Sequence, residues 1–311
     1  MGLFNSRKKD EAEVDKKPED LIAKTPEEEV EVSVREVSKP KAQKTYKDKK
    51  RVKNVVGTTQ VFAIINQKGG VGKSTTAINL AACLGAKGKQ VLVIDLDPQG
   101  NTTSGFGVER DEVQACAYSL LLKGLAPEDV IIPDIYEGVD IIPATIDLAG
   151  AEVELVSEMA REFRLKEAIG KVRGKYDYVI IDCPPSLGLL TLNALVAADK
   201  LLIPIQTEFY ALEGVTKLLE SMKTVKERGL NTSLDIFGVI LTMYDGRTKL
   251  SKEVSKEVEA YFGDLVFETR IPRSVRISEA PSYGEPIIDY DPEGRGAKKY
   301  RELAEEVISR G

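Results

Sequence analysis

The chain has 311 residues, of which 42% are hydrophobic and 30% are charged, so it can bury one large core or two ordinary ones. It contains no histidine, which excludes Ser-His-Asp and Cys-His nucleophilic catalysis and histidine-based zinc sites. Its formal net charge of −6 means that any contact with nucleic acid or an anionic membrane must come from local basic patches.

Residues 1–57 are predicted to form a disordered, charged tail rather than a domain. Apolar residues are sparse there, and Lys, Glu, Pro and Ser dominate, a composition that cannot bury a core. The charge is segregated, because residues 10–36 hold eleven acids whereas residues 39–53 hold eight bases and one acid. The tail is therefore either a solvated tether or a nonspecific contact for a polyanion beside the folded domain.

The first motif of the predicted folded domain is a glycine-rich turn between a strand and a helix. An apolar run at 61–65 leads into the string K-G-G-V-G-K-S-T at 68–75, and a helical pattern follows at 75–86. This order is typical of a Walker A phosphate loop, although an ordinary strand-to-helix turn is the simpler alternative. Lys73 would reach the β- and γ-phosphates of a nucleotide, and Ser74 would offer its hydroxyl to Mg²⁺. The predicted nucleotide-binding residues of this segment are Lys68, Gly69, Gly70, Val71, Gly72, Lys73, Ser74 and Thr75.

From residue 61 onward the hydrophobic pattern alternates between strands and helices. The run at 90–95 is short and almost wholly apolar, as expected for a central parallel strand. The alternation predicts one doubly wound α/β domain over residues 58–311, with a mostly parallel sheet and helices on both faces. Further strands are predicted at 138–142, 177–182, 200–205, 236–242 and 265–271, and helices at 150–173, 188–198, 211–228, 250–262 and 295–309.

Two of the predicted strands end in carboxylates. Asp95 and Asp97 lie in the string D-L-D-P-Q-G-N after the second strand, and Asp182 ends an apolar strand as in a Walker B motif. Ligands of open α/β sheets bind at the carboxyl ends of the strands, so these residues should converge with the phosphate loop. A carboxylate at Asp182 would bind Mg²⁺ through water. Each segment could instead be a plain turn, because Asp and Pro are common turn residues.

These strings resemble the ParA/MinD family of ATPases, whose phosphate loop is a deviant Walker A motif. The usual motif has a glycine where this chain has Gln67, and an extra lysine at the Lys68 position marks the family. D-L-D-P-Q-G-N and the string D-C-P-P-S-L-G at 182–188 resemble further family segments. The strings at 206–214 and 270–281 look like chromosomal ParA, or Soj, proteins in particular. The resemblance covers nearly all of the chain beyond the tail.

The resemblance implies an ATP hydrolase that uses ATP and Mg²⁺. It gives Asp97 the task of positioning the attacking water and lets Asp95 help to hold the Mg²⁺ shell. It puts Met243 and Pro272 at the border of the adenine. It also implies that Lys68 acts across a homodimer in which two subunits enclose two ATP molecules.

The resemblance further implies a DNA-partitioning ATPase that is cytoplasmic and associated with the nucleoid. ATP would drive dimerisation, the dimer would bind double-stranded DNA without sequence preference, and a ParB-type partner would trigger hydrolysis. The candidate DNA contacts are Arg247, Arg273 and Arg276, of which Arg247 and Arg276 match DNA-contacting basic residues of Soj-like proteins. Any one of these arginines could instead form a surface ion pair. The cargo, whether chromosome, plasmid or another body, is left open.

The alternative is a MinD-like ATPase that cycles on and off a membrane to position division proteins or another cargo. Such proteins end in a basic amphipathic helix with bulky apolar residues that lies in the membrane surface. The predicted helix at 295–309 mixes acids with bases and contains no Phe or Trp. We therefore expect a packed closing helix and no stable membrane association.

Overall fold

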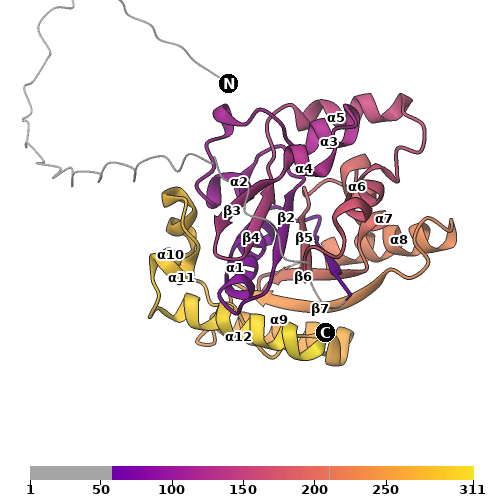
Figure 1. Cartoon of the computed structure of the whole chain (residues 1–311). Helices are drawn as coiled ribbons and strands as arrows, with labels where there is room; N and C mark the ends of the chain where they lie inside the picture. The colour runs from indigo at the N-terminus through magenta and orange to yellow at the C-terminus, as the bar shows by residue number, and fades with distance from the viewer. Residues whose placement is uncertain (1–57, 210) are drawn as a thin grey trace, which may run out of the picture. The chain divides into compact units, whose positions relative to one another are not determined.

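The computed structural model of the protein describes residues 58–209 and 211–311 (Figure 1). The predicted tail at 1–57 lies outside the described residues, so its disorder and its role stay predictions. Within the described part, a seven-stranded sheet has the order β3-β4-β2-β5-β1-β6-β7 and is parallel except for the β3–β4 pair. The strands are β1 (Gln60–Ile64), β2 (Val91–Asp95), β3 (Ile132–Tyr136), β4 (Val139–Ile142), β5 (Tyr178–Asp182), β6 (Lys200–Gln206) and β7 (Asp235–Thr242).

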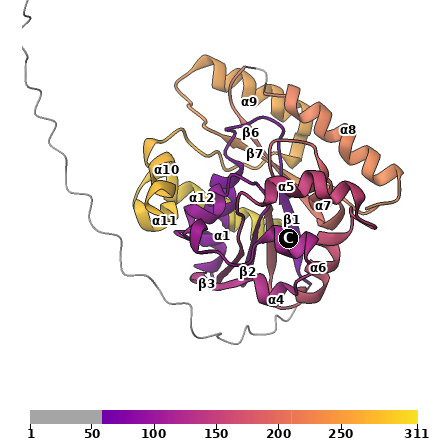
Figure 2. The same ribbon diagram turned by 90° about the horizontal axis from the view of Figure 1, so that it is seen from above.

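Helices cover both faces of this sheet, which confirms the predicted doubly wound α/β fold (Figures 1 and 2). One apolar core lies between the sheet and a layer that includes α1, α11 and α12, and a second core lies between the sheet and α3 and α5 to α9. The α-helices of the described residues are α1 (Lys73–Gly85), α2 (Asn101–Gly105), α3 (Ala117–Leu122), α4 (Pro127–Val130), α5 (Leu148–Glu154), α6 (Arg164–Val172), α7 (Leu189–Ala197), α8 (Glu213–Glu227), α9 (Lys249–Phe262), α10 (Val275–Glu279), α11 (Ile287–Tyr290) and α12 (Arg295–Arg310).

The central strands bring the predicted functional residues together. Every residue of β2 and β5 is buried, because each of these strands has a neighbour on both sides and helices above and below. Asp95 and Asp182 are directly paired across these two strands, and Ile64 of β1 pairs with Asp182 from the other side. The carboxyl ends of three strands therefore meet beside the phosphate loop, as the sequence predicts.

The single helix predicted at 150–173 is wrong. The chain forms α5, a 3₁₀ turn at Leu155–Ser157, and then α6 after a break that contains Ala160 with a positive φ of 51°. Asn193 of α7 stabilises the break, since its amide nitrogen donates to the Arg161 carbonyl (2.8 Å) and its oxygen accepts from the Leu165 N–H (3.2 Å). A contact of this kind between distant residues cannot be predicted from the spacing of apolar residues along the sequence.

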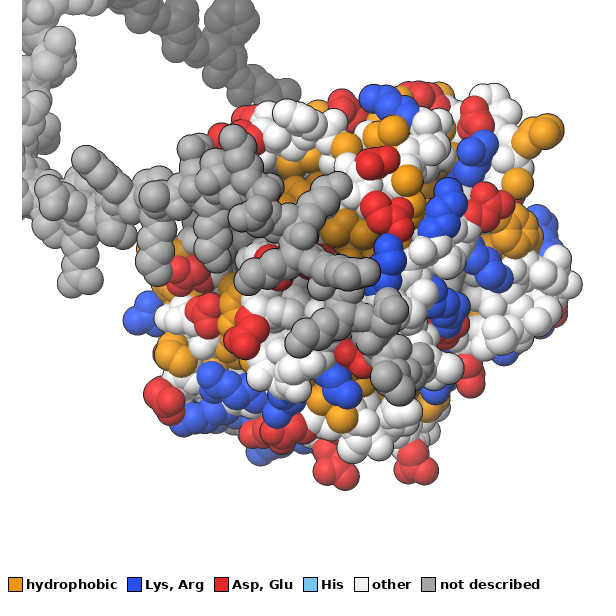
Figure 3. Space-filling view, in the orientation of Figure 1, with side chains coloured by type: hydrophobic (Ala, Val, Ile, Leu, Met, Phe, Trp, Pro, Cys, Tyr) orange, Lys and Arg blue, Asp and Glu red, His pale blue; other side chains and the backbone are white. Residues whose placement is uncertain are grey.

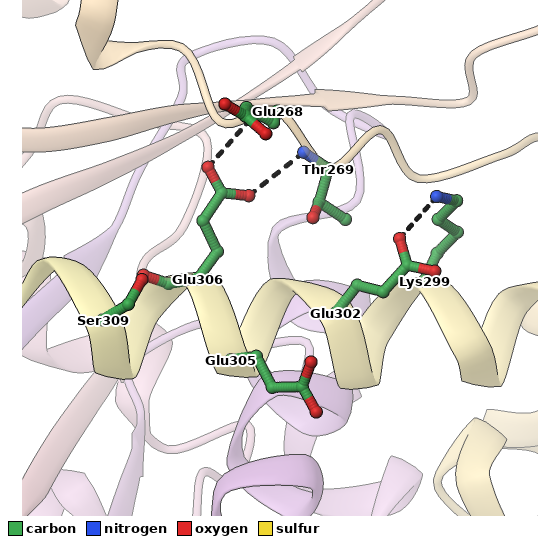
Figure 4. A pocket seen from close by; sticks show the side chains of 7 residues that line it. All are labelled: Glu268, Thr269, Lys299, Glu302, Glu305, Glu306 and Ser309. Carbon is green, nitrogen blue, oxygen red and sulfur yellow. Dashed lines mark hydrogen bonds and ion pairs between the residues drawn. The ribbon is translucent and has the colours of Figure 1, made fainter.

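The strand predicted at 265–271 is also wrong. This segment forms isolated bridges, Val239 with Val266 and Tyr244 with Pro272, and its residues 267 and 271 donate their N–H groups to carbonyls of β7 (2.9 Å each), but it makes no continuous ladder. Between them the carboxylate of Glu306 accepts the backbone N–H groups of residues 268 (2.8 Å) and 269 (3.1 Å), which leaves these two amides bonded to α12 (Figure 4). A side chain of α12 thus takes the hydrogen bonds that a continuous ladder would need.

The edge strand β3 was not predicted from the sequence. It contains Pro133 and also Asp134, which has a positive φ of 53°. The Asp134 N–H donates to the Asp140 carboxylate (2.8 Å). Proline and a left-handed residue both count against a strand in sequence patterns, and edge strands are where proteins tolerate them.

The closing helix α12 packs against the domain, as predicted. Its buried residues include Tyr300, Leu303 and Val307, which belong to the core that it shares with α1. Figure 3 shows acidic and basic side chains mixed along the lower edge of the face in view, where α12 runs in Figure 1. Among the described residues, no helix combines the length and the apolar character that crossing a membrane requires.

Candidate functional site

A pocket of about 550 Å³ lies where the phosphate loop, the loop after β2 and the segment after β7 meet. Its size suits a nucleotide, since small-molecule pockets occupy ~300–1,000 Å³. The lining residues are Gly69, Gly70, Gly72, Lys73, Ser74, Thr75, Ile78, Asp97, Gln99, Asn101, Ser104, Gly105, Pro185, Met243, Pro281 and Ser282.

The backbone of the phosphate loop is shaped for an anion. Gly70 and Gly72 have positive φ angles of 73° and 91°, which residues with a side chain rarely adopt. No side chain caps the N-terminus of α1, so its first N–H groups remain available to a negatively charged ligand. The Thr242 hydroxyl donates to the Val71 carbonyl (2.8 Å) and fixes the loop against the end of β7.

Lys73 is held inside this loop. Only 7% of the residue is exposed, and its Nζ donates to the Lys68 carbonyl at 3.4 Å. Burial lowers the pKa of Lys73, while the charge of Asp182 acts in the opposite direction. A buried ammonium with one long hydrogen bond gains stabilisation when a phosphate supplies further oxygen atoms.

Lys68 is anchored by its backbone and not by its ammonium group. Its N–H donates to the Asn66 side-chain oxygen (3.0 Å), and the Asn66 amide donates to the Pro204 carbonyl of β6 (2.8 Å). Within the described part of the chain, the Lys68 ammonium makes no hydrogen bond or ion pair. A Cβ added at Gly69 would meet no described atom within 4 Å, so this side of the loop is open.

Asp182 and Ser74 fit a magnesium ion. Asp182 is fully buried, and its Oδ2 accepts from the Thr102 hydroxyl (2.7 Å), whereas its Oδ1 has no partner among the described residues. A buried carboxylate oxygen without a donor is suited to a hydrated cation, and Ser74 at the start of α1 can supply a hydroxyl oxygen. In the described residues, no group of three or more His, Cys, Asp or Glu side chains could hold a metal ion.

Asp95 already has partners for both carboxylate oxygens. Oδ2 accepts from the Thr103 N–H (2.8 Å) and hydroxyl (2.7 Å), and Oδ1 accepts from the Asp97 N–H (3.1 Å). Burial, with the nearby charge of Asp182, raises the pKa of Asp95 to about 7. These bonds fix the Asp97 loop on the end of β2, and a part for Asp95 in the Mg²⁺ shell stays a prediction.

Asp97 lines the pocket and is mostly buried. Its Oδ1 accepts from the Gln99 N–H (3.0 Å), which turns the loop so that the carboxylate stays at the pocket wall. Met243 also lines the pocket and has a positive φ of 50°, a conformation that costs ~1–3 kcal/mol for a residue with a side chain. Pro272 does not line the pocket but pairs with Tyr244, next to Met243.

Several pocket residues were missed by sequence analysis. Ser104 and Gly105 lie in α2, a helix too short to produce a periodic pattern. Pro185 and Pro281 lie inside strings that resemble the family, so the motifs alone could have identified them.

The raised pKa of Asp182 predicts how stability depends on pH. Burial raises the pKa of Asp182 to about 6, above the usual 3.8, so the folded state holds this proton more tightly than the unfolded chain. Its contribution to stability is therefore complete below about pH 4 and is lost as the pH rises through about 6. Without nucleotide or Mg²⁺, the Asp182→Asn variant should therefore gain stability relative to the original protein as the pH rises from about 4 to about 8. Denaturant unfolding at several pH values measures this, and two parallel stability curves would contradict it.

The three candidate DNA-binding arginines are exposed, and each is paired with a carboxylate. The exposed fractions of the Arg247, Arg273 and Arg276 side chains are 91%, 60% and 62%. Arg247 pairs with Asp245, Arg273 with Glu208, and Arg276 with Glu279 at 3.5 Å. Exposed ion pairs of this kind are weak, so a phosphate group can replace the carboxylate.

Comparison with known proteins gives the family context of this geometry. A family profile described as an AAA domain matches residues 59–236. The sporulation initiation inhibitor protein Soj of Bacillus subtilis (strain 168) is 56% identical over 252 residues, which are 81% of this chain and 99% of Soj. The chromosome partitioning protein ParA of Myxococcus xanthus (strain DK1622) is 49% identical over 251 residues, which are 81% of this chain and 88% of that protein.

A solved structure with bound ligands is also similar. The crystal structure of cobyrinic acid a,c-diamide synthase from Mycobacterium smegmatis with a bound ATP analogue and magnesium has a TM-score of 0.70 and 38% sequence identity. The match covers 80% of this chain and 94% of that one.

Proposed function

Because the chain belongs to the ParA/MinD family of P-loop ATPases, we propose that it is a DNA-partitioning ATPase of the cytoplasm and nucleoid. In this proposal ATP binding drives formation of a homodimer, and the dimer binds double-stranded DNA without sequence preference. A ParB-type partner protein then triggers ATP hydrolysis, which releases the DNA.

The nucleotide pocket binds ATP with Mg²⁺. This assignment is supported by the similar M. smegmatis structure, which contains an ATP analogue and magnesium. The phosphate loop and Lys73 would hold the β- and γ-phosphates, and Ser74 and Asp182 would hold the ion. When bound, magnesium would neutralise charge on the phosphates. Asp97 at the pocket wall would orient the water that attacks the γ-phosphate.

Removing the Asp97 carboxylate should separate ATP binding from hydrolysis. The Asp97→Ala variant should keep ATP and remain a dimer on gel filtration, because its phosphate loop is intact. Its turnover rate should fall by about 100-fold or more, the usual effect of losing a group that orients or activates a nucleophile. Asp111→Ala, which changes an exposed aspartate outside the pocket, is the matched control. Normal phosphate release by Asp97→Ala would remove Asp97 from the catalytic role.

Dimerisation is supported by the Lys68 ammonium group, which is unpaired in the described part of the chain. Its ammonium group has no partner among the described residues, and the adjoining Gly69 has open space on its side-chain side. In a dimer with the two phosphate loops face to face, Lys68 would meet the nucleotide of the other subunit. Its positive charge would stabilise the negative charge that develops on the transferred phosphoryl group.

DNA binding is supported chiefly by the closeness of two of the arginines, Arg247 and Arg273, to the nucleotide pocket. Met243 lines the pocket, and the next residue, Tyr244, donates its N–H to the Ile271 carbonyl (2.9 Å) and accepts from the Arg273 N–H (3.4 Å). Arg247 lies in the same short loop. Arg247, Arg273 and the nucleotide pocket thus contact the same segment, as an ATP-controlled DNA-binding surface requires.

Substituting the arginines should weaken DNA binding equally for any sequence. A plot of the logarithm of the DNA association constant against the logarithm of the salt concentration has a negative slope. The Arg247→Ala and Arg276→Ala variants should each make this slope shallower by about one per lost phosphate contact. ATP-dependent dimerisation should survive, since neither side chain lines the pocket. Lys223→Ala, which removes an exposed lysine of α8 paired with Glu227, is the control. If the double arginine variant binds DNA normally, the basic segment 39–53 becomes the better candidate, and deletion of residues 1–57 tests it.

The MinD-like alternative has less support. The apolar residues of α12 are buried in the core or packed against it, so this helix has no free apolar face to lie in a membrane surface. The exposed side chains of this helix include both acids and bases, such as the pair Lys299–Glu302 and Glu305, which pairs with Lys87. Mixed charge of this kind has no preference for an anionic membrane.

A further inference from the structure

A group of buried hydroxyls lies where β6 and β7 end. Thr207, Thr242 and Ser251 are 1%, 2% and 5% exposed. Thr207 follows the last residue of β6, Thr242 ends β7, and Ser251 lies in the first turn of α9. The Thr207 and Ser251 hydroxyl oxygens are 3.1 Å apart, within hydrogen-bond distance. Neither hydroxyl lines the nucleotide pocket.

On one side these hydroxyls hold the wall of the nucleotide pocket. The Thr207 hydroxyl lies 3.3 Å from the Met243 carbonyl and 3.4 Å from the Thr242 carbonyl. The Thr242 hydroxyl donates to the Val71 carbonyl of the phosphate loop. Met243 keeps its left-handed conformation, and strained residues persist where surrounding bonds hold them. The position of the Met243 backbone is therefore tied to Thr207.

On the other side they hold the loop that carries Arg247. The Ser251 hydroxyl accepts from the Asp245 N–H at 3.4 Å. The Asp245 carboxylate accepts from the Arg247 N–H (3.0 Å), Nε (2.9 Å) and Nη2 (2.8 Å). The Ser251 N–H in turn donates to the Thr248 hydroxyl (3.2 Å), which caps α9. The start of α9 thus holds the backbone of the loop that carries Arg247, through the Asp245 N–H.

The residue after Thr207 reaches a second arginine. The Glu208 carboxylate forms the ion pair with Arg273. A shift of the short segment at 207–208 would therefore move contacts of Met243, of the Arg247 loop and of Arg273 together.

We propose that Thr207 and Ser251 are positioning residues that couple the nucleotide pocket to the DNA-binding arginines. The Asp245 N–H donates to the Ser251 hydroxyl, and the Ser251 hydroxyl has two acceptors, the Thr207 hydroxyl (3.1 Å) and the Thr207 carbonyl (3.3 Å). Both acceptors belong to Thr207, whose own hydroxyl can donate to the Met243 carbonyl, so the bonds run from the Arg247 loop through Ser251 and Thr207 to Met243. A nucleotide that presses on Met243 then shifts the Arg247 loop through these bonds. The inference rests on the proposed function, since it assigns to these residues the control of DNA binding by ATP.

The test compares DNA affinity in ATP with DNA affinity in ADP for the full chain and its variants, using a fluorescent duplex of mixed sequence. Thr207→Val keeps the shape of the side chain and loses the hydroxyl, so the ratio of the two affinities should fall about tenfold, within the usual range of allosteric coupling. ATP binding should persist, because the phosphate loop and Lys73 are unchanged. Thr207→Ser restores the hydroxyl and should restore the ratio.

A second variant guards against a folding defect at Thr207. Ser251→Ala should lower the ratio in the same way, and adding it to Thr207→Val should lower the ratio no further, because both remove the same connection. Thr224→Val is the matched control, since its hydroxyl bonds only within α8 (2.9 Å to the Glu220 carbonyl).

Two outcomes would overturn the inference, and they differ in what they imply for the proposed function. If Thr207→Val and Ser251→Ala lower the melting temperature but keep the ratio of the original protein, the hydroxyls are structural only, and the proposed function still stands. If the original protein binds DNA equally in ATP and ADP, the proposed function fails and the inference fails with it.

Discussion

Replacement of Lys73 by alanine is expected to abolish ATP binding and every step that follows it. Lys73 is buried in the phosphate loop, where its Nζ makes one long hydrogen bond to the Lys68 carbonyl and burial lowers its pKa. Phosphate oxygens would be its main partners, so the variant should lose affinity for ATP by about 100-fold or more, equivalent to ~2.7 kcal/mol.

The same substitution should leave the fold intact. Burying the Lys73 ammonium costs free energy in the absence of phosphate, so alanine should not lower the free energy of unfolding of the nucleotide-free protein by more than about 1 kcal/mol. Lys87→Ala, just beyond the C-terminal end of α1, removes an exposed lysine paired with Glu305 and serves as the control. Binding of a fluorescent ATP analogue measures the effect. Tight binding by Lys73→Ala would disprove the phosphate-loop assignment.

Replacement of Lys68 by alanine should have a different effect, because Lys68 is proposed to act on the nucleotide of the other subunit. ATP should still bind, since the loop backbone is held by Asn66 and Thr242 and Lys73 remains. ATP-dependent dimerisation and hydrolysis should be lost. Gel filtration with ATP and a phosphate-release assay separate these expectations. A Lys68→Ala protein that dimerises and turns over normally would reduce this lysine to a surface charge.

A mixture of the two variants tests the action of Lys68 in trans. In a mixed dimer, the nucleotide held by the Lys68→Ala subunit faces the intact Lys68 of the Lys73→Ala subunit. Some hydrolysis should therefore return in the mixture, although each variant alone is inactive. Lys68→Ala mixed with itself at the same total concentration is the control, and equal rates in the two samples would contradict action across the interface.

The central part of the fold could be predicted from the sequence because its strands are buried on both faces. The runs that became β2 and β5 are apolar throughout and end in Asp95 and Asp182, so both the strands and the meeting of their ends followed from the pattern. The peripheral elements depend on contacts between distant segments. Asn193 stabilises the break in the helix predicted at 150–173. Glu306 takes the Thr269 N–H, which a strand at 265–271 would have bonded to β7.

The candidate site shows the same division. The phosphate loop, Asp97 and Met243 were predicted and lie together at one pocket, because their strings resemble a family or because strand ends converge. The connection through Thr207 and Ser251 could not be predicted. Thr207 lies in the string at 206–214 that resembles the family, but nothing in that string indicates a contact with Ser251, which lies more than forty residues further along the chain. Their significance comes only from the burial and the bonds that the fold gives them.

The most direct test of the account is the dependence of DNA binding on the bound nucleotide. Gel-shift experiments with the full chain should be run with ATP, with ADP and without nucleotide, in parallel with sedimentation on anionic liposomes. The account predicts that ATP alone gives strong, salt-sensitive DNA binding, equal for unrelated sequences, and that the protein does not sediment with liposomes. ATP-dependent sedimentation with liposomes, together with DNA binding that is weak in every nucleotide state, would contradict it.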